Sequence, residues 1–120
     1  MNTAGEFQSL AGRLQSEKPV YPLAELNDLL TRASLDEIEL LPAPPIDDPY
    51  LANYVAAMVE QAIYIKGGRR PPPWTSGIKP LSRPVFAVPW MSLRAHLLLN
   101  SPVPFRRRNI FIDSGITDRV

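Results

Sequence analysis

Apolar residues recur at helical spacing along the first half of the chain. The first stripe runs from Phe7 to Leu14 with apolar residues at i, i+3, i+4 and i+7, which predicts one buried face of a helix that ends near Ser16. Thr3 and Glu6 have the spacing of a capping box at its start. This pattern predicts that the first element is a helix that packs one face against a core.

Two further stripes predict two more helices. One runs from Leu23 to Ala33 and is preceded by Pro22, which suits the first helical position because an N–H there has no intrahelical partner. Ser34 and Glu37 then repeat the capping-box spacing before another short apolar stripe. We therefore expect a second helix that begins at about Pro22, and a third, shorter helix directly behind it.

The longest stripe predicts a helix over about 49–66. Asp48 and Pro49 are typical of an N-cap and of the first helical residue, and a Gly-Gly pair follows as a C-terminal signal. The expected apolar face consists of Leu51, Tyr54, Val55, Met58, Ala62 and Ile65. Met58→Asp should therefore place an unpaired charge in the core, whereas Glu60→Gln, off this stripe, should change little.

The pattern changes in the second half of the chain, where prolines interrupt every apolar run. Eight of the fourteen prolines fall between Pro71 and Pro104. The segment 69–74, Arg-Arg-Pro-Pro-Pro-Trp, predicts an extended, polyproline-like path. Three short elements are also predicted: a strand over 84–88, a helix over 92–99 and a strand over 109–112.

The two halves also carry opposite charge. Residues 1–66 hold ten acidic and four basic side chains, whereas residues 67–120 hold two acidic and nine basic ones. The net charge is only +1 because the two halves nearly cancel. This asymmetry indicates a charged partner, or an acidic part that masks a basic one.

Together these patterns predict one small, mainly α-helical domain made of two parts. Residues 1–68 form an acidic helical part. Residues 69–120 form an extended, proline-rich basic arm with one short helix and one short strand or hairpin. A chain of 120 residues is long enough for a single core. We therefore expect the arm to form one structural unit with the first part or with a partner.

The composition excludes several kinds of chemistry. Without cysteine the chain has no disulfide, no thiolate nucleophile and no cysteine-bound metal. His96 is the only histidine, so we expect no metal site, no cofactor and no catalytic residue. The first residues lack the pattern of a secretory signal, and no apolar run approaches the roughly 20 residues that span a bilayer. We expect a cytoplasmic protein that binds no membrane.

The most basic run is Arg106, Arg107 and Arg108, which follows Phe105. Such a run can bind phosphates while the aromatic ring stacks on bases, can bind the carboxylates of a protein partner, or can fold back on the acidic half. Three arginines match no nucleic-acid-binding motif of defined docking geometry. We therefore favour pairing with a protein or within the chain.

Trp74, Phe86 and Trp90 are large apolar side chains in a segment with little predicted structure. Each can bury on the order of 150–250 Å², so we expect the helical half or a second chain to cover them. The prolines before Trp74 form either a ligand for a proline-binding groove or, as we favour, a stiff arm anchored on its own domain. The predicted partner-binding residues are Trp74, Phe86, Trp90, Phe105, Arg106, Arg107 and Arg108.

One part of the second half resembles a known group of proteins. The sequence from Ser92 to Ala95, together with that from Ser101 to Ile112, resembles the C-terminal part of short bacterial proteins. Those proteins accompany nucleotidyltransferase-like partners in toxin–antitoxin-type modules. The resemblance implies a bacterial cytoplasmic protein that neutralises such a toxin. The Gly-Ser…Asp-x-Asp pattern of a nucleotidyltransferase is absent, so this chain is not expected to be the enzyme of the pair.

We therefore expect a non-enzymatic partner-binding protein, an antitoxin or a regulatory subunit that masks an enzyme. A proline-rich arm suits this role because it loses less conformational freedom on binding. The alternative is a small nucleic-acid-binding protein that uses the basic half. A third interpretation is a small RNA-cleaving toxin that uses His96 and arginines. Salt separates the first two, because binding through phosphates weakens steeply with ionic strength.

Overall fold

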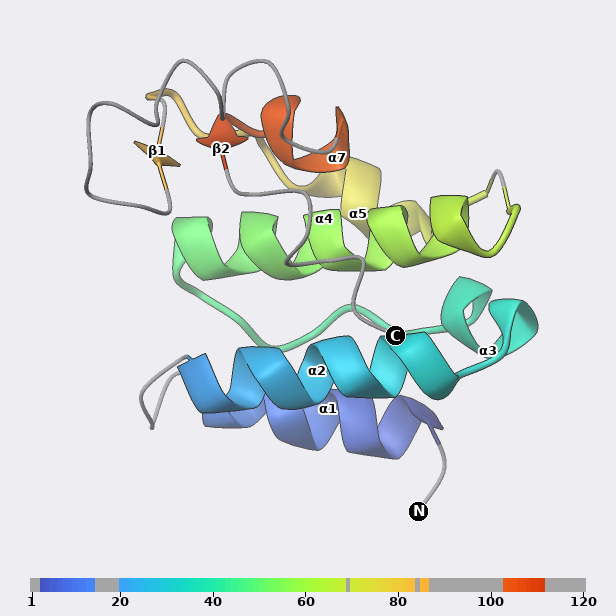
Figure 1. Ribbon diagram of the computed structural model, residues 1–120. Helices are drawn as coiled ribbons and strands as arrows, with labels where there is room; N and C mark the ends of the chain where they lie inside the picture. Colours follow the sequence, from blue (N-terminus) through green and yellow to red (C-terminus); the bar gives the residue numbers. More distant parts are fainter. Residues whose placement is uncertain (1–2, 15–19, 69, 84, 87–102, 112–120) are drawn as a thin grey trace.

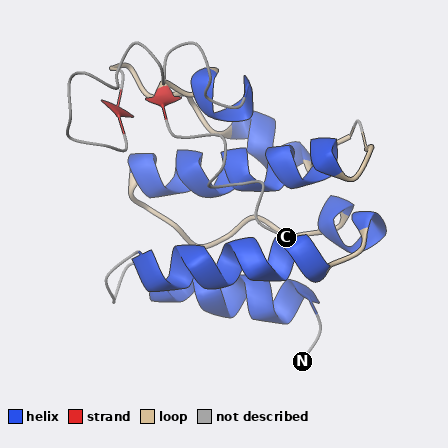
Figure 2. Ribbon diagram, viewed as in Figure 1, coloured by secondary structure: helices blue, strands red, loops and turns tan. Residues whose placement is uncertain are grey.

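The protein is mainly α-helical in the computed structural model (Figure 1), as the sequence predicts. The structure describes residues 3–14, 20–68, 70–83, 85–86 and 103–111. These residues form helices and one pair of two-residue strands (Figure 2). The predicted helix over 92–99 lies outside the described residues.

Three helices form the acidic part. They are α1 (Thr3–Arg13), α2 (Val20–Arg32) and α3 (Leu35–Glu39). The first two lie side by side (Figure 1) and bury the apolar stripes that the sequence predicts, including Phe7, Leu14 and Leu26. Hydrophobic periodicity thus locates all three helices to within a few residues.

The two predicted capping boxes have different outcomes. At α3 the box is present, because Ser34 Oγ accepts from the Glu37 N–H at 3.3 Å and Glu37 Oε1 accepts from the Ser34 N–H at 2.9 Å. At α1 the box is not formed as predicted, because Thr3 already lies inside the helix and its hydroxyl donates to Glu37 Oε2. This Thr3 bond, followed by the two Ser34 bonds, lowers the pKa of the exposed Glu37 carboxyl.

Helix α4 (Pro49–Ile65) runs through the middle of the molecule (Figure 1). Asp48 caps its first turn, as predicted, with Oδ1 accepting from the N–H groups of Tyr50 at 2.8 Å and Leu51 at 3.1 Å. Gly67 has a φ of 82° and ends the helix in the left-handed conformation that glycine adopts without strain. The predicted start and end of this helix are confirmed.

The burial of α4 corrects the apolar face that the sequence predicts. The expected stripe is buried at Leu51, Tyr54, Val55 and Met58. Ile65 is however exposed, and Glu60 is only 6% exposed, so the expectation that Glu60 lies off the buried face is wrong. The physical reason is that other segments cover α4 from two sides, as is typical of a helix with apolar residues all round.

The described residues of the second half add short elements on the far side of α4. They are α5 (Pro73–Gly77), β1 (Val85–Phe86), α7 (Val103–Arg106) and β2 (Ile110–Phe111). The two strands pair in parallel, with Val85 opposite Ile110, so the predicted strands do not form a hairpin. The predicted extended segment ends at Pro72, and α5 begins at Pro73, since proline suits the first turn of a helix.

Helix α4 also separates the charges. Helices α2 and α3 contact it from one side, and α5 and α7 contact it from the other (Figure 1). The described residues before α4 carry the acidic side chains Glu6, Glu25, Asp28, Asp36, Glu37, Glu39, Asp47 and Asp48 and the basic ones Arg13 and Arg32. Beyond α4 the described charged residues are all basic: Lys66, Arg70, Lys79, Arg83, Arg106, Arg107 and Arg108. We call α1–α3 the acidic layer, and residues 70–83, 85–86 and 103–111 the basic layer.

Candidate functional site

The predicted arginine run is divided between the core and the surface. Phe105 is fully buried and Arg108 is 5% exposed, whereas Arg106 and Arg107 are exposed. The helical turn of α7 continues past its end, because the N–H groups of Arg107 and Arg108 donate to the carbonyls of Val103 and Phe105, each at 3.0 Å. Residues three apart in such a turn share one side. Two of the three arginines therefore face away from the core.

Asn109 ends this turn and sets its orientation. Its φ of 64° lies in the left-handed region, which asparagine adopts more readily than most residues. Its Nδ2 donates to the Leu81 carbonyl at 2.6 Å, and its own carbonyl accepts from the Val85 N–H at 2.7 Å. These bonds fix the path from α7 into β2, and with it which arginines point inward.

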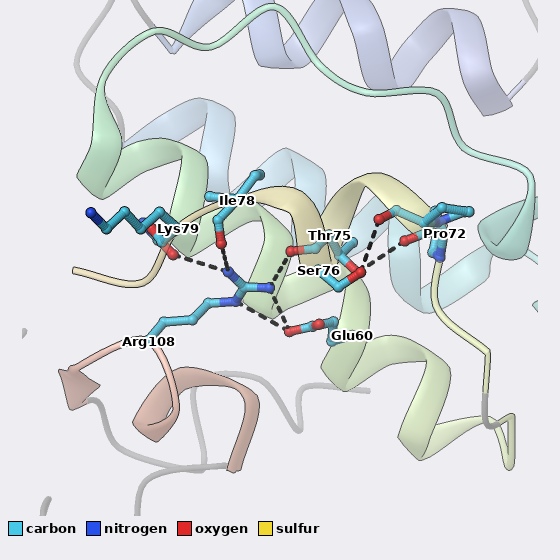
Figure 3. A network of polar contacts seen from close by, with 9 residues as sticks. Glu60, Pro72, Thr75, Ser76, Ile78, Lys79 and Arg108 are labelled. Carbon is cyan, nitrogen blue, oxygen red and sulfur yellow. Dashed lines mark hydrogen bonds and ion pairs between the residues drawn. The ribbon is translucent and has the colours of Figure 1, made fainter.

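Arg108 lies at the centre of a buried polar network (Figure 3). Its Nε donates to Glu60 Oε1 at 3.2 Å, and its Nη2 lies 3.1 Å from the same oxygen. Nη2 also donates to the Thr75 carbonyl at 2.6 Å, and Nη1 donates to Asn53 Oδ1 at 3.0 Å and to the Ile78 carbonyl at 3.4 Å. The five N–H groups of a guanidinium can thus all be satisfied by these acceptors.

The network joins three segments that are far apart in the sequence. Asn53 is itself fully used, because its Nδ2 donates to the carbonyls of Pro49 at 2.9 Å and Lys79 at 3.0 Å. Removing one partner of a buried ion pair leaves an uncompensated charge, at a cost of about 3–5 kcal/mol. For Arg108 the internal pairing that we weighed from the sequence is therefore what the structure contains. Because Phe105 and Arg108 are buried, neither lies on a surface that a partner can reach.

Trp74 anchors the proline-rich segment on the acidic layer. Its Nε1 donates to the Leu41 carbonyl at 2.8 Å, and its ring centroid lies 6.1 Å from that of Phe7. The helical half thus partly covers this side chain, as the anchored-arm interpretation expects. The backbone of Phe86 pairs in β1, but its side chain and the whole of Trp90 lie outside the described residues.

A groove opens where the end of α4 meets α5 and Arg107. It encloses about 290 Å³. Its lining consists of Glu60, Ile63, Tyr64, Pro71, Pro72, Thr75, Ser76 and Arg107. Neither Arg107 nor Arg106 forms an ion pair with any residue that the structure describes. We call this feature the α4–α5 groove, and it combines an exposed aromatic ring, proline walls and an available guanidinium.

A more open groove of about 400 Å³ lies between α1 and α2. Most of its charged side chains are already paired: Arg32 Nη2 lies 3.1 Å from Glu6 Oε2, and Glu25 Oε2 lies 2.6 Å from Arg13 Nη1. Both pairs are exposed to water, where such pairs contribute little. This groove is therefore the solvated seam between two amphipathic helices, and the α4–α5 groove is the better candidate for a binding site.

Sequence reasoning missed the polar residues that orient the site, above all Asn53 and Glu60. A signal for them exists, because they stand seven residues apart on a helix whose other residues, apart from Gln61, are apolar or aromatic. Residues at i and i+7 lie on one helix face. A polar pair on such a face indicates a buried polar partner, and the arginine run could have supplied it.

The described part of the chain shows no sign of a metal centre or a membrane span. Within it no three His, Cys, Asp or Glu side chains gather as metal ligands. None of its helices combines the length and the apolar character that crossing a membrane requires. Comparison of the chain with protein-family models, with curated proteins and with solved structures finds no match.

Proposed function

We propose that the chain is a non-enzymatic protein-binding domain whose basic layer docks an acidic surface of a protein partner. In its finer form the proposal is a bacterial, cytoplasmic antitoxin or regulatory subunit that masks an enzyme. The partner would be the nucleotidyltransferase-like toxin that the C-terminal resemblance implies. The observation that carries the proposal is that Arg106 and Arg107 are exposed and form no ion pair among the described residues.

The neighbours of these two arginines favour binding. Phe105 and Arg108, on either side of them, are both buried, so the backbone that carries Arg106 and Arg107 is held in place. A group that is fixed before binding loses less conformational freedom when it binds. Guanidinium groups form two parallel bonds to a carboxylate, which gives both strength and geometry. The acidic layer lies across α4, so it does not compete for them (Figure 1).

The burial of Phe105 bears on the alternative, a nucleic-acid-binding protein. Binding of single strands combines a basic groove with aromatic rings on which the bases stack. Phe105, the ring beside the arginine run, is fully buried and packs edge-on against Tyr54 at 5.2 Å. It is therefore unavailable for stacking, and this observation favours a protein partner over a nucleic acid.

Co-expression with the products of the neighbouring reading frames tests the proposal. The chain should form a stable complex with one of them and inhibit its activity. The double variant Arg106→Gln/Arg107→Gln should weaken that complex at least about tenfold, because each lost charge-assisted bond strands a carboxylate of the partner. The matched control is Lys79→Gln/Arg83→Gln, which removes the same charge from other exposed positions of the basic layer and should change affinity little.

Two outcomes would overturn the proposal. One is an equal loss of affinity in both double variants, because it would indicate unspecific attraction by net charge. The other is tight binding of RNA or DNA by the chain alone, with an affinity that falls steeply between about 50 and 200 mM salt. Fluorescence anisotropy with short oligonucleotides measures the second directly.

A further inference from the structure

We propose that the α4–α5 groove recognises an extended peptide segment of the partner. A carboxylate side chain of that segment binds Arg107, and one of its main-chain N–H groups donates to Glu60. This inference rests on the proposed function and adds the chemistry of the segment that is recognised. It is carried by the state of Glu60 and by the composition of the groove walls.

Glu60 offers an acceptor oxygen that no described residue uses. Both contacts from Arg108 reach its Oε1, at 3.1 and 3.2 Å, and no described hydrogen bond reaches Oε2. The side chain is 7% exposed and lines the groove. Among the described residues, the buried side-chain atoms that lack a hydrogen-bond partner do not include this oxygen, so Oε2 is accessible from the groove. The Glu60 carboxylate can therefore accept a hydrogen bond from an N–H that a ligand brings into the groove.

The charged side chains at the groove determine which hydrogen-bond donor and which charged group the ligand should carry. Arg108 already balances the negative charge of Glu60, so the groove carries the net charge of Arg107. A cationic donor such as a lysine side chain would be repelled, whereas a neutral amide N–H is not. The free guanidinium attracts a carboxylate at the same time. Together the two groups select an amide N–H and a carboxylate that lie close together, as in one acidic residue of a peptide.

The walls and the size of the groove select an extended segment. Tyr64, Pro71 and Pro72 line it with an aromatic ring and two pyrrolidine rings, which suit an apolar neighbour of the acidic residue. At about 290 Å³ the groove holds a few side chains and not a whole helix. A helix moreover uses its N–H groups internally, whereas an extended chain leaves its N–H groups free, with every second one on the same side.

Peptide titration of the full chain, followed by amide NMR shifts, tests the inference. The probe is acetyl-Leu-Glu-Leu-amide, raised to about 5 mM so that a Kd near 1 mM is measurable. We expect shifts at Tyr64, Ser76 and Arg107, and at least about tenfold weaker binding when the central Glu is replaced by Gln or Lys. Methylation of the Glu nitrogen should weaken binding similarly, whereas methylation of the C-terminal amide should not. Equal binding of the Glu and Lys peptides, or no shifts at the highest concentration, would overturn the inference.

Variants of the chain separate this inference from the proposed function. Arg107→Gln should weaken peptide binding about tenfold, and Arg106→Gln, the matched control outside the groove, should change it less than about twofold. Tyr64→Ala should weaken binding of the peptide and binding of the partner alike. If the partner complex depends on both arginines but not on Tyr64, the proposed function stands and the groove inference fails. If the peptide binds as expected but no partner does, the reverse holds.

Discussion

The acidic layer and the basic layer are held against α4 by different interactions. The acidic layer packs through apolar side chains such as Leu26 and Ile38, both fully buried, and its ion pairs lie at the surface. The basic layer also buries Phe105, but its centre is the ion pair between Arg108 and Glu60. Apolar contact is not directional, whereas hydrogen bonds fix position and angle. The basic layer is therefore held in one orientation, and that layer carries the proposed binding face.

A short arginine run can thus serve two purposes. Arg108 orients the segment through its buried contacts, and the adjacent Arg107 is thereby placed at the α4–α5 groove. A flexible run of three exposed arginines would lose more conformational freedom on binding. Under the proposed function, the internal ion pair thus supports binding without contacting the partner.

Removing the guanidinium of Arg108 should have the largest effect on stability. We expect Arg108→Met to lower the free energy of unfolding by about 4 kcal/mol, because Glu60 is then a buried charge without a partner. Urea denaturation followed by circular dichroism measures the loss. The double variant Glu60→Met/Arg108→Met removes both charges and should recover most of it. Equal losses in the single and double variants would show that packing, not charge, holds the basic layer.

Shortening a buried side chain of the acidic layer should lower the free energy of unfolding by less, and should leave binding unchanged. We expect Leu26→Ala to lower the free energy of unfolding by about 3 kcal/mol, since it leaves a cavity beneath α2. Where the variant is still folded, binding by the basic layer should be unchanged. The control is Leu40→Ala, because Leu40 is 81% exposed and its loss should cost under about 0.5 kcal/mol. A loss of binding in the Leu26 variant would contradict the separation of the two layers.

Alkaline pH should loosen the contact between α4 and the basic layer. Burial, with a smaller contribution from Tyr50, raises the pKa of Tyr54 to about 12 from its ordinary 10.0. The stability from keeping this phenol neutral is full below pH 10 and is lost as the pH rises through 12, at a cost of about 2 kcal/mol. Tyr54→Phe should therefore raise the midpoint of alkaline unfolding, measured by fluorescence, while Tyr64→Phe on the exposed end of α4 should not.

Removing the helix cap of α4 should have the smallest effect on stability. Asp48→Ala removes the acceptor for two N–H groups of the first turn and should cost about 1 kcal/mol in thermal or urea unfolding. Asp48→Asn keeps an equally good capping side chain and should be nearly neutral. Because α4 packs against both layers, the loss of stability should affect both of them. A loss of stability confined to one layer would mean that the Asp48 side chain does more than cap α4.

The acidic layer could be predicted from the sequence because its determinants are local. The stripe from Phe7 to Leu14, the Ser34 capping box and the Asp48-Pro49 start of α4 each depend on residues within a few positions of one another. Such local patterns can be recognised directly from the helical spacing of apolar residues. Trp74, expected to anchor the proline-rich segment on its own domain, also lies where that interpretation places it.

The candidate site could not be predicted because its partners are far apart in the chain. Glu60 and Arg108 are separated by 48 positions, and the parallel pairing of Val85 with Ile110 by 25. Nothing local in the run of arginines tells which one turns inward. That depends on the turn that α7 begins and on the left-handed Asn109 that ends it. The spacing of Asn53 and Glu60 was the one local hint of the network.

Hydrogen exchange of the wild type and of Arg108→Met, read by mass spectrometry, tests whether the Arg108–Glu60 pair holds the basic layer in place. Regions that open independently of the rest lose protection as separate units. We expect α5 and residues 103–111 to lose protection in the variant while α1 and α2 keep theirs. Equal loss of protection in both layers, or no loss in the basic layer, would contradict it.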